Sequence, residues 1–448
     1  MTETAIIVLA AGMGTRMKSD VPKVLHKAAG RSLLGHVLSV GNSLDPQKVI
    51  VVHGPDQPGL AEEVALYCPQ AELALQAERL GTAHAVAQAL PMLDGFTGNI
   101  VVLYGDCPLI LPRTLSKLLE LIVEASPMAV LGFEALNPMG YGRLINNSEG
   151  RLSAIREELD CSPAEKAIRL CNSGVIAIDA DLLRELLPEV NNSNAKGEFY
   201  LTDLAALAAS RDASALILVC AEEEVIGVND RVQLSMVENV LQNRLRTLAM
   251  ANGATLIDPA TVYFSADTRL GRDVVIEPNV WFGPNVDVGD GVNIYGFSHI
   301  EGARIAPGAK VGPFARLRPG SDVGENAKIG NFVEVKAAKL GEGAKLNHLS
   351  YIGDAEVGPG ANVGAGTITC NYDGFDKYKT QIGAGAFIGS NSSLVAPVQI
   401  GDGAYVGSGS VITKDVPADS LALTRPEQVL REGWAERMRK AKSESKKK

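Results

Sequence analysis

Hydrophobic positions in the second half of the chain recur every six residues. They fall at Leu270, Ile276, Phe282, Val288, Ile294 and Ile300, then after a five-residue step at Ile305, Val311, Leu317, Val323, Ile329 and Val335, and again at Ile382, Ile388, Leu394, Ile400, Val406 and Ile412. The residue two positions earlier is usually small, as at Ala386, Ser392, Ala404 and Ser410. Three such hexads make one triangular coil, with apolar residues stacked inward and small residues or Gly at the corners. The pattern predicts a parallel β-helix, in which each coil buries its core only against its neighbours.

The first half of the chain shows a different pattern. Continuous apolar runs at residues 5–10, 48–53, 99–104 and 129–133 are typical of strands buried on both faces. Helical spacing occupies the segments between them, for example residues 82–93 and 114–123. This alternation predicts an α/β domain, Rossmann-like in its layers, with a mostly parallel sheet.

A helix is expected between the two halves. Apolar residues at Leu234, Val237, Leu241, Leu245 and Leu248 have helical spacing, and Asn229 or Asp230 could cap the start. Of 46 glycines, 18 lie in residues 1–250 and 28 in the shorter remainder. We therefore expect a front domain at 1–229, a linker helix at 230–250, and a β-helix with a C-terminal tail at 251–448.

Composition narrows the class of protein. The 448 residues are 46% hydrophobic and 21% charged, as in ordinary soluble globular proteins, and the net charge of −10 argues against a nucleic-acid surface. Six cysteines without a C-x-x-C pair suggest neither a zinc site nor a disulfide framework. No apolar stretch is long enough to cross a bilayer, and the start does not resemble a signal peptide. We expect a cytoplasmic protein with no membrane partner, and a basic tail beyond Arg425 that is solvated and frayed.

A glycine-rich turn follows the first expected strand. It reads Leu9-Ala10-Ala11-Gly12-Met13-Gly14-Thr15-Arg16-Met17, with Pro22-Lys23 shortly after. Such a turn lets backbone N–H groups approach phosphates, and Arg16 and Lys23 add positive charge there. The spacing matches neither the G-x-G-x-x-G dinucleotide pattern nor a P-loop. The alternative is a loop whose glycines merely turn the chain, which the two cations disfavour.

Other polar residues suit a nucleotide site. Tyr104 and Asp106 end an expected strand at the edge of the sheet where α/β ligands bind, and Asp106 could hold Mg2+ with Asn229 as a second oxygen ligand. Gln76 and Gly81-Thr82 are consistent with a base pocket. Each alone could equally be a helix cap or an ordinary loop.

The motif L-x-x-G-x-G-T-x-M-x4-P-K resembles the signature of sugar-1-phosphate nucleotidyltransferases. Joined to hexapeptide repeats, it makes essentially the whole chain similar to a bacterial family of bifunctional enzymes of UDP-N-acetylglucosamine biosynthesis. The resemblance implies a left-handed β-helix, acetylation of glucosamine-1-phosphate by acetyl-CoA, and then transfer of UMP from UTP with release of pyrophosphate. It also implies Mg2+ as cofactor and a homotrimer with acetyl-CoA between subunits.

The same resemblance implies roles for particular residues of the front domain. The uridine nucleotide would contact Leu9, Ala10, Ala11, Gly12, Lys23, Gln76, Gly81, Thr82 and Tyr104; Mg2+ would bind Asp106 and Asn229; the sugar would contact Gly142, Glu157 and Asn172. Leu159 stands where the family commonly has lysine, so Glu158 remains an alternative to Glu157. Lys23 and Arg16 would neutralise charge during in-line attack on the α-phosphorus.

His348 is the candidate base in the β-helix. It lies two positions after the inward residue Leu346, so it should point out of the coil, with Glu334, Lys336 and Tyr351 on the same or the adjacent coil. Glu334 could orient its ring. The other histidines, at 26, 36, 53, 84 and 299, are interpreted as structural or simply exposed.

The resemblance also implies the ligands of this second site. Glucosamine-1-phosphate would contact Arg318, Lys336, Tyr351 and Asn362, and acetyl-CoA would contact Ala365, Asn371, Tyr372, Ser390, Ser408 and Arg425. The polar insertion at residues 369–379 interrupts the repeat and could reach a neighbouring subunit.

Two other functions remain possible from the sequence. One is a sugar-1-phosphate nucleotidyltransferase whose β-helix is only structural or regulatory. The other is a scaffold without activity, which the presence of Arg16, Lys23, Asp106 and Asn229 disfavours.

Overall fold

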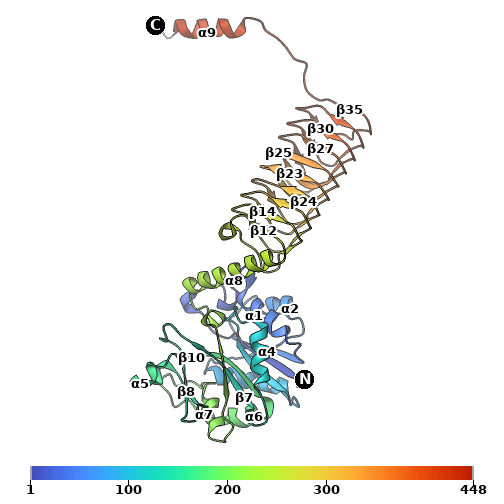
Figure 1. The fold of residues 1–448 in the computed structure, drawn as a ribbon. Coiled ribbons are helices and arrows are strands. Elements are labelled where there is room, and N and C mark those ends of the chain that lie inside the picture. Colours follow the sequence, from blue (N-terminus) through green and yellow to red (C-terminus); the bar gives the residue numbers. More distant parts are fainter. Residues whose placement is uncertain (1–2, 446–448) are drawn as a thin grey trace. The chain divides into compact units, whose positions relative to one another are not determined.

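The computed structural model describes residues 3–445 and divides the chain into two compact units, Met1–Leu245 and Arg246–Lys448. Helix α8 (Arg231–Ala251) contains the point of division and confirms the helix expected there (Figure 1). None of the helices in residues 3–445 has the length and apolarity needed to cross a membrane.

A mixed sheet forms the centre of the first unit. Its main strands run in the order β11-β7-β10-β6-β1-β4-β5. Their bounds are β1 (Thr4–Leu9), β4 (Lys48–His53), β5 (Glu72–Leu75), β6 (Asn99–Tyr104), β7 (Met128–Glu134), β10 (Leu170–Asp179) and β11 (Leu216–Cys220). The four expected strands are present, and only β10 runs antiparallel to its neighbours on this path.

Smaller strands and the helices complete the unit. A hairpin of β8 (Arg143–Asn146) and β9 (Leu152–Arg156) extends from β10, and β2 (Lys27–Ala28) pairs with β3 (Arg31–Ser32). The α-helices are α1 (Leu33–Asn42), α2 (Leu60–Tyr67), α3 (Thr82–Ala89), α4 (Pro112–Glu120), α5 (Pro163–Lys166), α6 (Ala180–Leu186) and α7 (Asp203–Ala209). The helices expected at 82–93 and 114–123 correspond to α3 with a following 3-10 turn and to α4.

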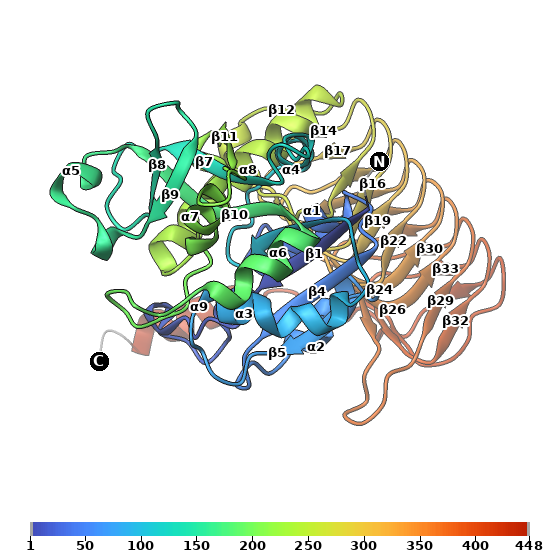
Figure 2. The ribbon, with the colours of Figure 1, turned by 90° about the horizontal axis from the view of Figure 1, so that it is seen from below.

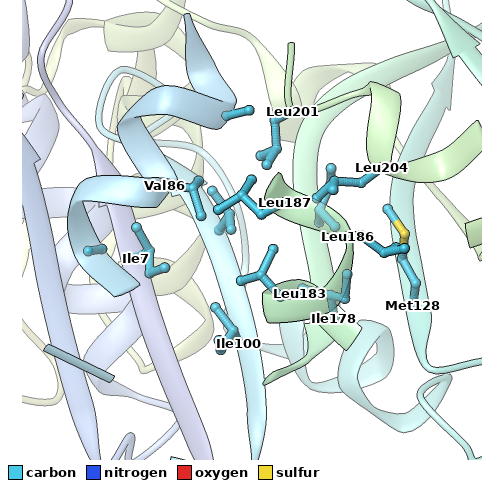
Figure 3. Close-up of a cluster of buried hydrophobic side chains, with 14 of the residues drawn as sticks. Ile7, Val86, Ile100, Met128, Ile178, Leu183, Leu186, Leu187, Leu201 and Leu204 are labelled. Atoms are coloured by element: carbon cyan, nitrogen blue, oxygen red, sulfur yellow. The ribbon is translucent and has the colours of Figure 1, made fainter. Parts of the chain in front are cut away.

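Both faces of the sheet are buried. Ile7 and Ile100 pack on one face with Val86 of α3 and Leu183 of α6 (Figure 3). Neighbouring strand residues point the other way, so Ile6 packs with Leu34, Leu38, Val64 and Leu115 from α1, α2 and α4. Burial on two faces explains why these strands read as continuous apolar runs. Because helices cover both faces, a ligand would bind at the loops that follow the strand ends.

The second unit is a parallel β-helix. One sheet stacks β12 (Thr255–Leu256), β14 (Val275–Ile276), β17 (Asn293–Ile294), β20 (Lys310–Val311), β23 (Lys328–Asn331), β25 (Lys345–His348), β27 (Asn362–Val363), β30 (Phe387–Ile388), β33 (Tyr405–Val406) and β35 (Leu421–Ala422). Most strands pair with the segment 17 or 18 residues further on, which is one coil of three hexads. The step from Asn362 to Phe387 is longer because the polar insertion lies between them.

The other sides of the coil carry the remaining strands. Figure 2 shows β16, β19 and β22 following one another along one side. The strands are β13 (Arg269–Leu270), β16 (Val286–Val288), β19 (Ala303–Ile305), β22 (Ser321–Val323), β24 (Glu334–Leu340), β26 (Tyr351–Val357), β28 (Ile368–Cys370), β31 (Ser393–Val395) and β34 (Val411–Ile412), with β15 (Trp281–Phe282), β18 (His299–Ile300), β21 (Arg316–Leu317), β29 (Thr380–Ile382) and β32 (Val398–Ile400).

The six-residue repeat marks the core of this unit. Every repeat residue from Ile276 to Ile412 named above is buried, and Leu270 in the first coil is half-buried. The small residues are also buried rather than forming the corners themselves: Ala386 and Ser392 lie just inside them. The residue before each, such as Gly385 or Asn391, makes the turn with a left-handed backbone.

The C-terminal tail differs from the expectation of a frayed end. Residues Trp434–Ser445 form helix α9, whose side chains are all exposed. The solvated character expected for this segment is therefore present, but the segment is helical. The last three lysines lie outside the described residues.

Candidate active sites

The glycine-rich turn leaves β1 at the carboxyl edge of the sheet. The Ala10 N–H donates to the Val52 carbonyl (2.8 Å) and the Gly105 N–H to the Leu9 carbonyl (2.9 Å), which ties the turn to both neighbouring strands. Gly14 has a left-handed backbone, and a Cβ there would lie 2.5 Å from Cβ of Lys23. Glycine at this position therefore lets the turn pass close to the lysine.

A cavity of about 290 Å³ opens beside this turn. Ten of the residues predicted from the sequence line it: Leu9, Ala10, Ala11, Gly12, Lys23, Gln76, Gly81, Thr82, Tyr104 and Asp106. Arg16 is exposed and does not line it. Sequence reasoning missed the other four lining residues, which are Val24, Arg79, Ala85 and Glu198.

Arg79 is the most informative of the missed residues. Its Nε donates to the Ala11 carbonyl at 2.6 Å, so the guanidinium braces the glycine-rich turn. Among the described residues it makes no ion pair. The sequence could have indicated Arg79, because this cation lies between Gln76 and Gly81, which were both already assigned to the site.

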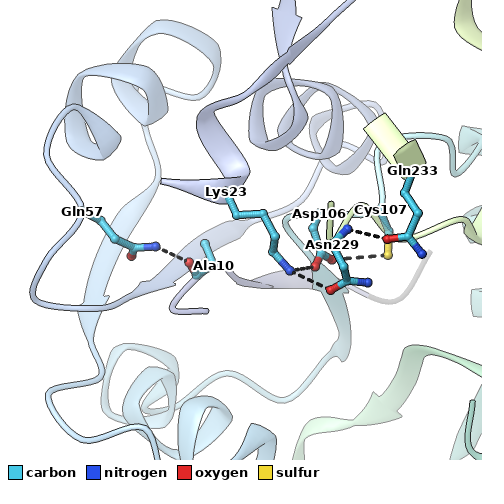
Figure 4. Close-up of polar contacts among 7 residues, drawn as sticks. All are labelled: Ala10, Lys23, Gln57, Asp106, Cys107, Asn229 and Gln233. Carbon is cyan, nitrogen blue, oxygen red and sulfur yellow. Dashed lines mark hydrogen bonds and ion pairs between the residues drawn. The ribbon is translucent and has the colours of Figure 1, made fainter. Parts of the chain in front are cut away.

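Lys23 and Asp106, which line the cavity, meet Asn229, which does not line it; Figure 4 shows the contacts among the three side chains. Nζ of Lys23 forms an ion pair with Asp106 Oδ2 and lies 3.3 Å from Asn229 Oδ1. The Val228 N–H donates to the Asp106 carbonyl (3.0 Å), and Gln233 accepts from the Asn229 N–H (2.7 Å). These contacts bring a loop more than a hundred residues away in the chain against the end of β6.

The same two oxygens suit a hard divalent cation. In residues 3–445 no three His, Cys, Asp or Glu side chains gather as a metal-binding group. Two side-chain oxygens are nevertheless enough for Mg2+, which keeps waters and phosphate oxygens as its other ligands. The ammonium group of Lys23 already lies against both, so the site accommodates positive charge.

Gln76 is held in a defined orientation. It is buried, and its Nε2 donates to the Gly81 carbonyl and to Nδ1 of His84, both at 3.1 Å. Thr82 Oγ1 accepts from the Leu201 N–H at 2.9 Å. His84 thus helps to hold Gln76 in this orientation.

The predicted sugar residues cluster next to the cavity but do not line it. The Asn172 N–H donates to the Gly142 carbonyl (2.8 Å), and a Cβ on Gly142 would lie 3.4 Å from Glu157 Oε1. Burial raises the pKa of Glu157, whose Oε1 accepts from Thr202 Oγ1 at 3.3 Å. Glu158 instead pairs with buried Arg143 at 2.8 Å.

Tyr104 lies between the two parts of this site. Its hydroxyl has a raised pKa, first because of burial and then because of the nearby carboxylates of Glu157 and Asp106. The phenol thus stays neutral and can donate a hydrogen bond at any physiological pH. Burial likewise raises the pKa of Cys107 well above its usual value, so this thiol is not a nucleophile.

His348 is exposed on the β-helix, as its phase predicted. Its Nδ1 lies 2.6 Å from Oδ1 of Asn331, which faces it on the preceding coil. The expectation that Glu334 orients the ring is wrong, because Glu334 forms an ion pair with Arg318 at 2.9 Å. On consecutive coils, Tyr351 pairs in register with Glu334, and Gly353 pairs in register with Lys336.

The residues expected to contact acetyl-CoA lie along the following coils. Backbone contacts connect Ala365 to Asn391 (2.7 Å) and Ser390 to Gly409 (2.8 Å), and Arg425 Nη1 donates to the Ser408 carbonyl (2.7 Å). Asn371 is buried, with its amide on Asp354, whereas Tyr372 is 59% exposed. Asn362 lies on β27, directly after Lys345 of β25 in the stack.

Comparisons with known proteins agree with both halves. Residues 6–148 match the MobA-like NTP transferase domain, and residues 379–414 match the bacterial transferase hexapeptide (six repeats). The chain is 54% identical to the bifunctional protein GlmU of Azorhizobium caulinodans over 98% of both chains. It is 54% identical to GlmU of Paramagnetospirillum magneticum, over 98% of this chain and 97% of the relative. The GlmU of Paracoccus denitrificans is 52% identical over 98% of both chains.

The chain belongs to the bifunctional GlmU family. The fold expected from the sequence is confirmed: a nucleotidyltransferase domain followed by a left-handed β-helix of hexapeptide repeats. Membership also confirms the expected enzyme of UDP-N-acetylglucosamine biosynthesis, with both glucosamine-1-phosphate acetyltransferase and N-acetylglucosamine-1-phosphate uridyltransferase activity. GlmU-type enzymes act on small molecules, and nucleotidyltransferases generally use a divalent metal.

Proposed function

We propose that the cavity beside the glycine-rich turn binds UTP for uridylyl transfer. The observation that carries this assignment is the convergence of ten predicted residues from five separate segments on one cavity. The backbone of Ala10 to Gly12 would approach the phosphates, and Gln76 with Gly81 would contact the base. Lys23, and Arg16 from outside the cavity, would neutralise phosphate charge.

The sugar phosphate would enter from the side of Tyr104. Gly142, Glu157 and Asn172 would hold N-acetylglucosamine-1-phosphate there, so that its phosphate oxygen attacks the α-phosphorus of UTP in line. Glu157 is preferred to Glu158 because Glu158 is already engaged by Arg143. Positioning and charge neutralisation would then carry the rate, since the protein forms no covalent bond.

Mg2+ is the metal proposed for this reaction. Asp106 and Asn229 would hold it, and when bound it would neutralise charge on the triphosphate. Lys23 now lies against both oxygens, so its ammonium group would be released towards the phosphates.

We propose that His348 is the base in acetyl transfer. It would take a proton from the 2-amino group of glucosamine-1-phosphate as the amine attacks the thioester carbonyl of acetyl-CoA. Arg318, Lys336, Tyr351 and Asn362 would contact the sugar phosphate. Ala365, Asn371, Tyr372, Ser390, Ser408 and Arg425 would contact acetyl-CoA.

A homotrimer is proposed for the assembly, in line with what is typical of hexapeptide β-helices. An exposed aromatic column supports it: Phe297, Phe314 and Phe332 stack on successive coils with ring centroids 5.0 and 5.1 Å apart. Leu349, beside His348, follows Phe332 one coil later and is 62% exposed. Such a patch is what a subunit contact would cover.

We also retain the division into residues 1–229, 230–250 and 251–448 as a proposal. A cytoplasmic location is proposed as well. All six cysteines are free thiols, which suits a reducing compartment.

The first test supplies the pure protein with glucosamine-1-phosphate, acetyl-CoA, UTP and Mg2+, and follows free CoA and pyrophosphate separately. Release of both, with pyrophosphate depending on acetyl-CoA, is the expected result. Pyrophosphate release only from supplied N-acetylglucosamine-1-phosphate, without CoA release, would leave a uridyltransferase on a structural β-helix.

A further inference from the structure

The imidazole of His348 lies within hydrogen-bonding distance of the side chain of Asn331. Nδ1 and Oδ1 are 2.6 Å apart, and the contact joins residues on consecutive coils. Strands β23 and β25 pair in register at Lys328 and Lys345, at Ile329 and Leu346, and at Asn331 and His348. The amide therefore meets the ring because of the stacking of the coils, and not through local chain geometry.

The backbone around the pair is fixed on both sides. The Leu349 N–H donates to the Asn331 carbonyl at 3.1 Å. The His348 carbonyl accepts from Ser350 Oγ at 2.9 Å and from the Gly366 N–H at 3.4 Å. Ser350 is only 3% exposed. Both chain segments are therefore held in place, and the contact with Asn331 orients the exposed ring.

An amide oxygen can only accept a hydrogen bond. A ring nitrogen facing Asn331 Oδ1 must therefore carry the proton, which leaves the lone pair on the other nitrogen, Nε2. With Oδ1 of Asn331 facing Nδ1, the contact implies the tautomer that carries its proton on Nδ1. Nε2 is the atom that can take a proton.

We propose that Asn331 is the positioning residue for acetyl transfer, holding His348 with Nδ1 protonated and Nε2 directed at the substrate amine. This inference rests on the proposed role of His348 as base. As the amine nitrogen bonds to the acetyl carbon, its proton passes to Nε2. The carbon–sulfur bond breaks, and the CoA sulfur leaves with that proton. The Asn331 oxygen accepts from Nδ1–H throughout, and it stabilises the charged ring while Nε2 carries the proton.

Three variants test this role. General-base catalysis contributes about 10²–10⁴-fold, so losing the orientation should lower the kcat of acetyl transfer in Asn331→Ala by about ten- to a hundredfold. The KM for glucosamine-1-phosphate should stay within about twofold, because no substrate contact is removed. The acidic midpoint of the pH–rate profile should move to lower pH in Asn331→Ala and to higher pH in Asn331→Asp, since an acceptor for the charged ring is lost in one and strengthened in the other. A purely structural role would not produce opposite shifts.

The surroundings allow a clean comparison. The charged residues on the stacked strands around His348 are Lys328 on β23 and Lys345 on β25, while β27 has none. Glu334 is occupied by Arg318. All of these remain in the variants. Asn293→Ala removes an amide from the same sheet two coils away and should change neither kcat nor the midpoint. The thermal unfolding of the β-helix, measured on the same samples, reports whether that unit is folded.

His348→Ala distinguishes a wrong assignment of the base from a wrong assignment of the positioning role of Asn331. If it retains wild-type acetyl transfer, the base itself is wrongly assigned. If it is inactive but both Asn331 variants keep the wild-type kcat and pH midpoint, only the positioning role is overturned. A lower kcat with unmoved midpoints in both Asn331 variants would overturn it as well.

Discussion

The two units of this chain build their sites in opposite ways. In the front unit, Gly12, Lys23, Gln76 and Asp106 come from separate loops and meet at one cavity, and Asn229 joins them from far along the chain. In the β-helix, His348 and Asn331 are 17 residues apart and meet because their coils stack in register.

The difference shows how each architecture determines which residues of a sequence become neighbours. A sheet covered on both faces leaves only its loop ends for chemistry, and the strand order decides which loops become neighbours. A coil of three hexads places each residue against those one coil away, so neighbours follow from counting. Separate sites of this kind predict that the two activities can be removed independently.

The largest effect is expected for His348→Ala. Acetyl transfer should fall by about 10²–10⁴-fold because the proposed base is lost, while uridylyl transfer from supplied N-acetylglucosamine-1-phosphate should be unchanged. CoA and pyrophosphate release measure the two reactions. His299→Ala is the matched control, since His299 is exposed on the same β-helix and stacks on Trp281. Retained acetylation would remove His348 from the mechanism.

Asp106→Ala should produce the opposite loss of activity. Uridylyl transfer should fall by about 10²–10³-fold, because the charged oxygen at the proposed metal site and beside Lys23 is lost, and acetyl transfer should persist. Asp94→Ala, an exposed acid of the same unit, should leave both reactions intact. Loss of both activities in a folded Asp106 variant would contradict the independence of the sites.

A cavity in the β-helix core tests the stacking itself. Ile329 is fully buried in β23, and Ile329→Ala should cost about 2–5 kcal/mol of stability in that unit. The temperature at which acetyl transfer is lost should drop, while that for uridylyl transfer should not. Lys328→Ala, exposed on the same strand, is the control. Equal losses in both activities would mean that the units unfold together.

Low pH should lower the stability of the front unit rather than that of the β-helix. Burial lowers the pKa of His36 to about 4, so the unfolded chain binds a proton below about pH 6.5 that the folded unit does not. Stability is therefore present above pH 6.5 and lost towards pH 4, by up to about 3 kcal/mol. His299 and His348 of the β-helix are exposed.

Residual activities after heating at pH 7, 6 and 5 measure this difference. Uridylyl transfer should become the more heat-sensitive reaction as pH falls, and His36→Gln, which does not titrate, should reduce the effect. An unchanged pH dependence in that variant would exclude His36 as the cause.

The sequence by itself determined the β-helix almost completely. Its repeat residues are buried and His348 points outward, because hexad phase alone separates inward from outward positions. The glycine-rich turn and the buried strands of the front unit were likewise readable, since close backbone approach requires glycine and two-sided burial requires apolar runs.

The tertiary structure decided which side chains meet. The sequence named Glu334 as the residue that could orient His348, whereas in the structure Asn331 contacts the ring and Glu334 forms an ion pair with Arg318. The contact of Glu158 with Arg143 similarly separates it from Glu157. Arg79 lines the cavity beside the glycine-rich turn, where its Nε donates to the Ala11 carbonyl. When several neighbouring side chains could pair with the same group, no repeat in the sequence shows which of them does. Only the packed structure shows which pair forms.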